Sequence, residues 1–409
     1  MKIINTYAVL AALTLFSACN DGSSDKDSIP SISGCIVEVN SFGQPIPSFT
    51  PAEMKAAGFD YADLVDVTID DIHLRNMPFV SSFNEVAVLE PSYVDYNAKG
   101  DDYGFAMLNG DFHYYICGKP GDKVTMTLAQ KGGYQKTYEL MKSVYSTDRL
   151  AGETATEYAN FRMVTTTGIA PGVLYRSSNP LNCVKNAKRY AVADSLARVV
   201  GIKTEIDLAD TPEDVQKYMA MDGYSSSYCP GLFKAGSTIA CGMMANSFND
   251  DFKTRMGEAA KFMLTHEPPY LVHCNEGKDR CGFVSMVLEA LVGASVEELR
   301  RDYMVTLLNF YKIEDKGESY QMRQKLSIDR MIWLLCNEES MENYVAINWD
   351  EADVTAIDWE GLGLFTTQTG GFQGARLQAA AKKYLQECGL TDEECEALRL
   401  RLTIGLDEE

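Results

Sequence analysis

The stretch "YLVHCNEGKDRCGF", Tyr270 to Phe283, combines a short apolar run with a dense set of polar and reactive residues. The run "YLVH" is typical of a short buried strand. A loop containing a glycine follows, and a helix is expected from near Arg280 to Ala290. A strand, a loop and a helix in this order predict one unit of an α/β sheet, with the loop at the end of the strand.

The sequence on both sides of this stretch also alternates between helix and strand signals. A helix is predicted over residues 183–200, with Gly201 as its C-terminal stop, and an apolar strand over residues 202–208. Further helices are indicated by Thr211 with Pro212, by the series Phe252, Met256, Ala259, Ala260 and Met263, by Ser295 with Glu298, and by Thr391 with Glu394 after Gly389. We therefore predict an α/β domain over residues 146–409, with a largely parallel central sheet flanked by helices.

Residues 34–145 have a different pattern, with period-two alternation and many turn residues. The segments "LVDVTI" (64–69), "EVAVLE" (85–90) and "KVTMTL" (123–128) are predicted strands, and "KPGD" (119–122) is a turn before the last of them. We predict a small β-rich domain, of which a barrel is one form. We find no catalytic constellation in this part of the sequence.

Residues 1–18 have the pattern of a secretory signal, with Lys2, an apolar run at 7–16 and then small residues. The run is too short to span a bilayer, which takes about 20 residues. Cys19 directly after "FSA" resembles a bacterial lipoprotein signal, which implies lipidation of Cys19 and an exported protein anchored to a membrane. A plain cleaved signal peptide is the alternative. Residues 19–33 are expected to form an acidic tether.

Charge and metal-ligating residues limit the function classes. The formal net charge of -21 repels nucleic acid and leaves no polybasic patch for anionic lipid, so any binding of a phosphorylated ligand is expected to be local. The four histidines are dispersed, and most cysteines show neither disulfide-framework nor zinc spacing. We expect neither a metal nor a cofactor.

The loop of the opening stretch carries a reactive constellation. Backbone N–H groups of such a loop converge with the N-terminus of the following helix on one anion site. Cys274 starts the loop, where donors and positive potential are expected to lower the pKa of its thiol. Arg280 offers a bidentate fork to a tetrahedral oxyanion, and Gly277 allows a sharp turn. The pattern predicts a nucleophile beside a phosphate-binding loop.

At these residues the chain resembles the cysteine-based protein tyrosine phosphatase superfamily, whose signature is H-C-x5-R. "HCNEGKDR" supplies His273, Cys274 and Arg280, and Lys278 with Asp279 narrows the resemblance to bacterial tyrosine phosphatases with a G-K-D-R loop. Four segments resemble other landmarks of that family in the right order: "NFR" (160–162), "GVLYRSS" (172–178), "GIKTEIDL" (201–208) and "RDYM" (301–304). The resemblance covers roughly residues 155 to 405.

The resemblance implies a two-step hydrolysis of a phosphomonoester. Cys274 would attack phosphorus to form a cysteinyl-phosphate, which water then hydrolyses. The implied phosphate-binding residues are Asn275, Glu276, Gly277, Lys278, Asp279 and Arg280. His273 and Cys281 would orient the loop, and Arg176 is expected to support it from behind.

The identity of the general acid stays open between two aspartates. Asp207 matches the aspartate of the family's "D-L-R" segment and is slightly favoured, while Asp279 lies in the loop itself, with Asp210 a third candidate. Three residues depart from the family pattern: Cys281 replaces Ser or Thr, Ala209 replaces the arginine of "D-L-R", and Glu276 places a negative charge in the loop. We interpret them as features of a modified enzyme, and Cys281 with Cys274 as a candidate reversible disulfide.

Protein phosphotyrosine is the substrate that the resemblance implies first. Lys278 beside Arg280 also suits phosphoinositides or inositol phosphates, so a lipid or soluble phosphate substrate is the alternative. A protein that binds phosphopeptides with little turnover is the alternative from another functional class.

Overall fold

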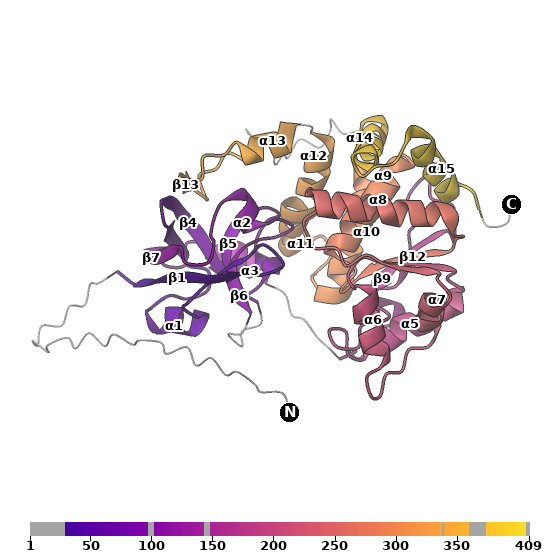
Figure 1. Cartoon of the computed structure of the whole chain (residues 1–409), viewed down its shortest axis with the longest axis horizontal. Helices are drawn as coiled ribbons and strands as arrows, with labels where there is room; N and C mark the ends of the chain where they lie inside the picture. The colour runs from indigo at the N-terminus through magenta and orange to yellow at the C-terminus, as the bar shows by residue number, and fades with distance from the viewer. Residues whose placement is uncertain (1–28, 97–101, 143–147, 338, 360–373, 406–409) are drawn as a thin grey trace, which may run out of the picture.

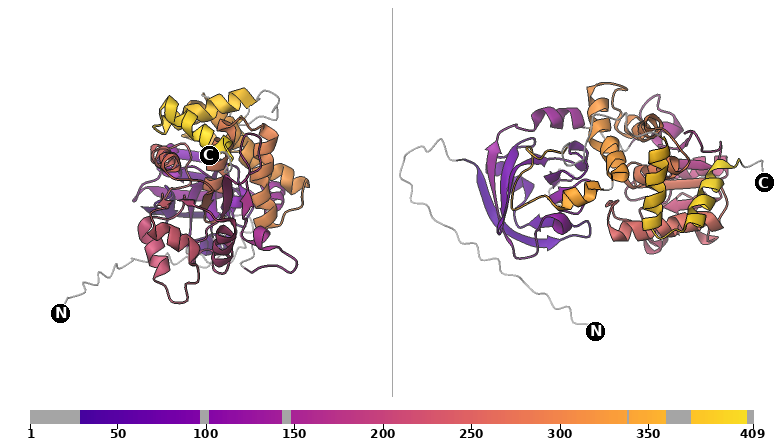
Figure 2. Two further views of the ribbon diagram at one scale, coloured as in Figure 1. Left: turned by 90° about the vertical axis from the view of Figure 1, so that its right-hand side faces the viewer. Right: turned by 90° about the horizontal axis from the view of Figure 1, so that it is seen from above.

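The computed structural model describes residues 29–96, 102–142, 148–337, 339–359 and 374–405. The predicted signal, Cys19 and most of the tether lie outside the described residues, so the anchoring stays a prediction. Within the described ranges, no helix has both the length and the apolar character needed to cross a bilayer. Figure 1 and the right-hand view of Figure 2 show a β-rich module beside an α/β domain.

The α/β domain is built on a sheet whose order, in the described residues, is β11-β10-β12-β9-β8. Its strands are β8 (Arg162–Met163), β9 (Leu174–Ser178), β10 (Thr204–Asp207), β11 (Thr238–Ala240) and β12 (Tyr270–Cys274). Strands β9 to β12 pair in parallel, and only the edge strand β8 is antiparallel. The predicted α/β class with a largely parallel sheet is confirmed.

Helices cover both faces of this sheet (Figure 1). The helices of the domain are α4 (Ala155–Tyr158), α5 (Arg189–Val200), α6 (Pro212–Met219), α7 (Tyr228–Lys234), α8 (Asp250–Thr265), α9 (Asp279–Leu291), α10 (Val296–Tyr311), α14 (Gly374–Glu387) and α15 (Asp392–Thr403). Successive residues of β12 point to opposite faces. Leu271 belongs to a cluster with Ala197 of α5, whereas Val272 belongs to the cluster of Met256 and Phe283 from α8 and α9.

Local sequence signals set several helix ends as predicted. Thr211, Ser295 and Thr391 each form a reciprocal capping box with the residue three positions later. Gly201 ends α5 in the left-handed region, with φ 76°. Helix α5 begins at Arg189 and not at residue 183, because the side chain of Asn182 accepts the N–H groups of Val184 and Lys185 and holds the segment in a turn.

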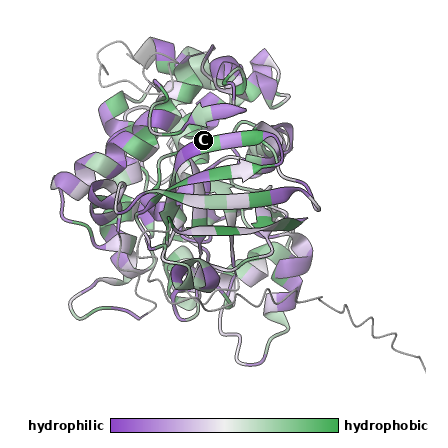
Figure 3. Cartoon of the chain, turned by 90° about the vertical axis from the view of Figure 1, so that its left-hand side faces the viewer, coloured by the Kyte–Doolittle hydropathy of each residue, from purple (hydrophilic) through white to green (hydrophobic). Residues whose placement is uncertain are grey.

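The N-terminal module is an antiparallel-rich sheet with described order β2-β1-β7-β3-β4-β5-β6. Its elements are β1 (Ser31–Val39), β2 (Pro45–Pro47), α1 (Pro51–Ala56), β3 (Leu64–Ile69), β4 (Ile72–Val80), η1 (Phe83–Glu85), β5 (Pro91–Asp95), β6 (Tyr103–Met107), α2 (Phe112–Tyr115), β7 (Lys123–Gln130) and α3 (Gln135–Met141). Figure 3 shows hydrophilic and hydrophobic residues alternating along its strands. The predicted strands at 64–69 and 123–128 are present as β3 and within β7.

The predicted strand at residues 85–90 is wrong. This segment contains the end of the 3₁₀ turn η1 and then irregular backbone with one isolated β-bridge, between Val88 and Leu108. The carboxylate of Glu90 accepts the N–H of Ala87, and the N–H of Val88 bonds to the carbonyl of Leu326. The alternation of apolar and polar residues in this segment therefore reflects burial between the N-terminal module and the later part of the chain, and not membership of a continuous strand.

The C-terminal half of the chain returns to the N-terminal module. The connection runs through α11 (Glu318–Gln324), the π-helical turn η2 (Lys325–Asp329), α12 (Arg330–Cys336) and α13 (Glu339–Val345) to strand β13 (Glu351–Asp353). Strand β13 pairs in parallel with β4. The guanidinium groups of Arg323 and Arg330 also donate to the carbonyls of Asn84 and Val88. A division of the chain into two domains at residues 145/146 therefore separates β13 from the sheet with which it pairs.

Candidate active site

The loop of residues 275–278 joins the carboxyl end of β12 to the first turn of α9. Gly277 adopts φ 76°, and a Cβ there would lie 2.4 Å from the carbonyl oxygen of Ser177. Both the left-handed backbone and the close approach of β9 therefore require glycine. The loop lies at the carboxyl ends of parallel strands, where open α/β sheets bind ligands.

Side chains behind the loop hold its carbonyl groups. Asn186 donates to the carbonyl of Asn275 at 2.8 Å, Asn160 to that of Glu276 at 3.0 Å, and Arg176 to that of Gly277 at 2.7 Å. A trans peptide turns each carbonyl and the following N–H in opposite directions. Fixing these carbonyls away from the cavity therefore turns the amide groups of the next residues towards it.

A buried ion-pair network supports this arrangement. Asp302 of α10 pairs with Arg176, and its other oxygen lies 2.9 Å from Nε of Arg162. Burial opposes ionisation of Asp302, but the two guanidinium groups outweigh it and hold the pKa of this carboxyl well below its usual range. The predicted landmarks at 160–162, 172–178 and 301–304 thus meet beneath the loop, and Arg176 supports it as expected.

His273 and Asp207 lie behind the loop and not in the cavity. Nε2 of His273 is 3.0 Å from a carboxylate oxygen of Glu205, and its Nδ1 is 3.8 Å from Oδ1 of Asp207. Burial works against protonation of His273, yet the two carboxylates raise its pKa. Burial, reinforced by Asp210, raises the pKa of Asp207 to about 8. Asp207 is fully buried and does not line the cavity, so the choice between Asp207 and Asp279 as general acid stays a prediction.

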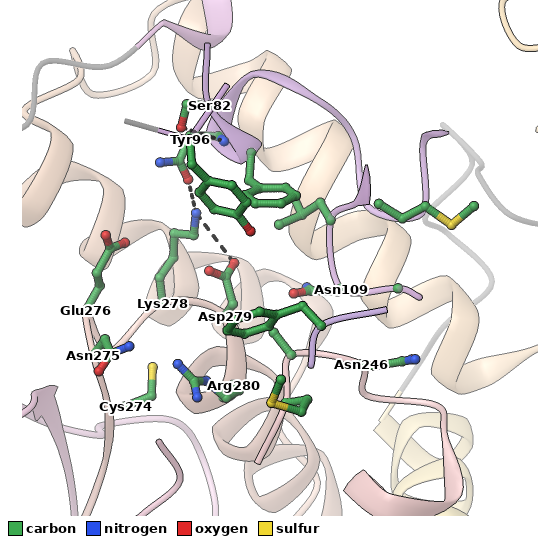
Figure 4. Close-up of a pocket in the computed structure, with 18 of the residues that line it drawn as sticks. Ser82, Tyr96, Asn109, Asn246, Cys274, Asn275, Glu276, Lys278, Asp279 and Arg280 are labelled. Atoms are coloured by element: carbon green, nitrogen blue, oxygen red, sulfur yellow. Dashed lines mark hydrogen bonds and ion pairs between the residues drawn. The ribbon is translucent and has the colours of Figure 1, made fainter. Parts of the chain in front are cut away.

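A cavity of about 310 Å³ lies above the loop. We call residues 274–280 the floor of this cavity. Cys274 and Arg280 both line it, and Figure 4 shows the sulfur and the guanidinium pointing towards the same part of it. Arg280 is held by a hydrogen bond of 2.8 Å to the carbonyl of Met243, in the loop after β11. Asp279 lines the cavity as well.

The N-terminal module forms the opposite wall of the cavity, which we call the roof. The roof residues are Phe42, Gln44, Ser82, Phe83, Asn84, Tyr96, Met107, Leu108, Asn109 and Gly110. The rings of Phe83 and Tyr96 pack with centroids 3.8 Å apart, and Gln44 donates to the hydroxyl of Tyr96 at 3.1 Å. The roof was not foreseen, because its residues come from four separated segments that share no motif.

Lys278 joins the floor to the roof. Its ammonium group donates to the side-chain carbonyl of Asn84 and lies 3.5 Å from Oδ1 of Asp279 (Figure 4). It also lies 5.2 Å from the ring centroid of Tyr311, and the residue is only 4% exposed. The ammonium group is therefore engaged between the two parts of the chain.

The two residues beside Cys274 that depart from the family pattern, Glu276 in the loop and Cys281 in α9, have distinct environments. Glu276 accepts a hydrogen bond from the hydroxyl of Tyr311, and burial raises the pKa of its carboxyl. Cys281 is fully buried, with its sulfur 3.3 Å from the carbonyl oxygen of Val272. Burial raises the pKa of Cys281 to about 11, so this residue is a neutral thiol near neutral pH. Within the described ranges, no three His, Cys, Asp or Glu side chains gather as a metal site.

The fold and the site together define a protein tyrosine phosphatase-like α/β domain preceded by a β-rich module. Residues 156–358 match the model of the tyrosine phosphatase family. Among solved structures, the core catalytic domain of the PP-IP phosphatase SIW14 from S. cerevisiae, in complex with citrate, is similar over 46% of this chain and 96% of that chain, with 20% identity and a TM-score of 0.25. No curated protein sequence matches the chain.

Proposed function

We propose that the protein is a cysteine-dependent phosphatase that hydrolyses phosphotyrosine. The observation that carries the proposal is the floor itself. Cys274 and Arg280 line one cavity at the end of β12, beside a loop in which the carbonyls of residues 275–277 are held from behind. This arrangement offers a nucleophile, a bidentate cation and backbone donors to one tetrahedral phosphate.

In the first step, the thiolate of Cys274 attacks phosphorus and the bond from phosphorus to the leaving oxygen breaks. Arg280 and the amides of the floor stabilise the charge on the equatorial oxygens. Asp279 supplies the proton to the leaving oxygen, because it is the aspartate that lines the cavity while Asp207 does not.

In the second step, water attacks the cysteinyl-phosphate, the sulfur–phosphorus bond breaks and inorganic phosphate leaves. Asp279, now a carboxylate, accepts the proton of this water. The hydroxyl that relatives have after the arginine is replaced here by the buried thiol of Cys281. A thiol is a weaker hydrogen-bond donor than a hydroxyl, so we expect this step to be the slower one.

The chemistry of the cavity favours an aromatic monoester over a polyphosphorylated substrate. Apolar or aromatic side chains contribute much of its lining: Phe42, Phe83, Tyr96, Met107, Leu108 and Met244. Its cations are Lys185, Lys278 and Arg280, and Lys278 is already engaged by Asn84 and Asp279. An inositol carrying several phosphates needs more free positive charge than this cavity presents.

The test is phosphate release by the full mature chain in the presence of a metal chelator. The substrates are phosphotyrosine peptides, phosphoserine peptides, phosphoinositides and soluble inositol phosphates. Cys274→Ser should abolish release, whereas Cys183→Ser, which removes a thiol outside the cavity, should retain it. Phosphotyrosine should be the best substrate.

Two results would overturn the proposal in different ways. Faster release from inositol phosphates or phosphoinositides would move the protein to that substrate class and leave the cysteine mechanism intact. Tight binding of phosphopeptides to the wild type without release from any substrate would make it a binding protein.

A further inference from the structure

A second hollow lies directly beside the catalytic cavity. This groove of about 680 Å³ is lined by Asp111, Tyr114, Tyr115, Asn246, Phe248, Asn249, Asp250, Asp251, Met341, Glu342 and Val345. Asn246 lines both the groove and the catalytic cavity. On the opposite side, Gly110 lines the cavity and the next residue, Asp111, lines the groove. The groove therefore continues from the cavity across the junction of the two parts of the chain.

The side chain of Asn246 has an unusual environment at this junction. The residue is 4% exposed, and in the part of the chain that the structure describes neither its amide nitrogen nor its amide oxygen has a hydrogen-bond partner. In Figure 4 this amide points away from Cys274. A buried polar group without a partner typically costs about 1–3 kcal/mol. An asparagine amide offers a donor and an acceptor side by side, which match the C=O and N–H groups of a polypeptide backbone.

The charged side chains that line the groove, among the described residues, are all acidic. Its lining includes four carboxylates, Asp111, Asp250, Asp251 and Glu342, and none of the described residues that line it is Lys, Arg or His. Arg255 lies 2.9 Å from Asp251 and neutralises it in part, while Asp250 and Glu342 are exposed at the surface. The ring of Tyr114 is 73% exposed beside them, and an exposed ring can receive a cation on its face.

We infer that this groove binds the polypeptide segment next to the phosphotyrosine of the substrate, and that it selects segments carrying Lys or Arg. Asn246 hydrogen bonds to the backbone of that segment where it leaves the cavity. Asp250 and Glu342 attract its basic side chain. The inference rests on the proposed function, and it specifies a substrate: a protein phosphorylated on tyrosine near a basic residue.

The experiment compares kcat/KM for free phosphotyrosine with that for matched phosphotyrosine peptides. The peptides carry two Lys, two Ala or two Glu residues, placed before the phosphotyrosine in one set and after it in another. In one of the two sets, the Lys peptide should exceed the Glu peptide about fivefold or more at low salt. This preference should shrink as salt is raised, because exposed charges are screened.

Two variants separate the contributions of charge and of the amide. Combined Asp250→Asn and Glu342→Gln should reduce the preference for the Lys peptide about two- to fivefold for each charge removed. Asn246→Leu should lower kcat/KM for every peptide relative to free phosphotyrosine by about tenfold, through loss of two backbone hydrogen bonds. Asp222→Asn removes an exposed carboxylate that does not line the groove and should change neither ratio.

The outcomes distinguish the two proposals. Hydrolysis of free phosphotyrosine and of all peptides with equal efficiency, unchanged by these variants, would overturn the groove and leave the phosphatase standing. A preference for the Glu peptides would also overturn it. No hydrolysis of any phosphotyrosine substrate would defeat the proposed function itself.

Discussion

The floor and the roof of the cavity are built by different physical means. The floor is a short continuous segment in which the carbonyls of residues 275–277 are fixed by buried polar groups, above an ion-pair network centred on Asp302. The roof comes from scattered segments and consists largely of aromatic, apolar and amide side chains. The ammonium group of Lys278 in the floor donates a direct hydrogen bond to Asn84 in the roof. In the proposed function, the floor supplies the reactive groups and the roof supplies the shape that selects a substrate.

The strongest test of this contrast removes the centre of the network beneath the floor. Asp302→Asn leaves Arg162 and Arg176 buried without their countercharge, and breaking such a pair typically costs about 3–5 kcal/mol. Chemical denaturation should show this loss of stability. The control is Glu267→Gln, which breaks the exposed pair with Lys203 and should cost less than about 1 kcal/mol. Equal losses in both variants would contradict a specialised floor.

The next effect concerns Asp279, the proposed proton donor in the floor. Asp279→Asn should lower kcat for phosphotyrosine about 100-fold, because a general acid typically contributes at least this factor. The loss should be much smaller for an aryl phosphate whose leaving group is a stronger acid than tyrosine. The same leaving-group dependence in Asp207→Asn, but not in Asp279→Asn, would return the role to Asp207.

A third test uses the pH dependence of stability. The pKa of Asp207 rises from 3.8 to about 8 in the folded chain, so between these values the folded state holds a proton that the unfolded state has released. The contribution of Asp207 to stability is therefore full below about pH 4 and is lost as pH rises towards 8. Asp207→Asn should flatten the fall of Tm between pH 5 and 8 by about 2–4 °C. A slope identical to that of Asp222→Asn would contradict this assignment.

The smallest effect is expected in the roof. Tyr96→Leu should raise KM for phosphotyrosine about three- to tenfold, since an aromatic pair contributes about 0.5–1.5 kcal/mol beyond burial. An alkyl phosphate should be affected less. Tyr103→Leu changes an aromatic residue of the same module that does not line the cavity and serves as the control. Equal changes for aryl and alkyl phosphates would show that the roof does not select the substrate.

The contrast also explains what the sequence could predict. The strand, loop and helix around Cys274 depend on local rules, and so do the capping boxes at Thr211, Ser295 and Thr391. These features were predicted correctly, apart from shifts of helix ends such as the start of α5. The burial of Asp207 could not be predicted, because its position at a strand end suits both a cavity and a buried site behind the loop.

The roof was beyond local rules for a different reason. Phe42, Phe83, Tyr96 and Asn109 meet only because the whole module packs against the α/β domain. The segment at 85–90 shows the same limit, since its alternating residues face a partner from residues far along the chain. Burial between two parts of a molecule and pairing in a sheet leave a similar pattern in a sequence.

The return of β13 to the N-terminal module has a consequence for biosynthesis. A ribosome releases β4 early, but its parallel partner β13 emerges only after the loop that follows Cys274. Until then, the backbone groups of residues 73–75 that β13 will pair are left open, as at an exposed sheet edge. Interrupted synthesis or proteolytic cleavage before residue 351 would leave this edge available to other chains. Aggregation of shortened products, and not only loss of activity, is the expected signature of an incomplete chain.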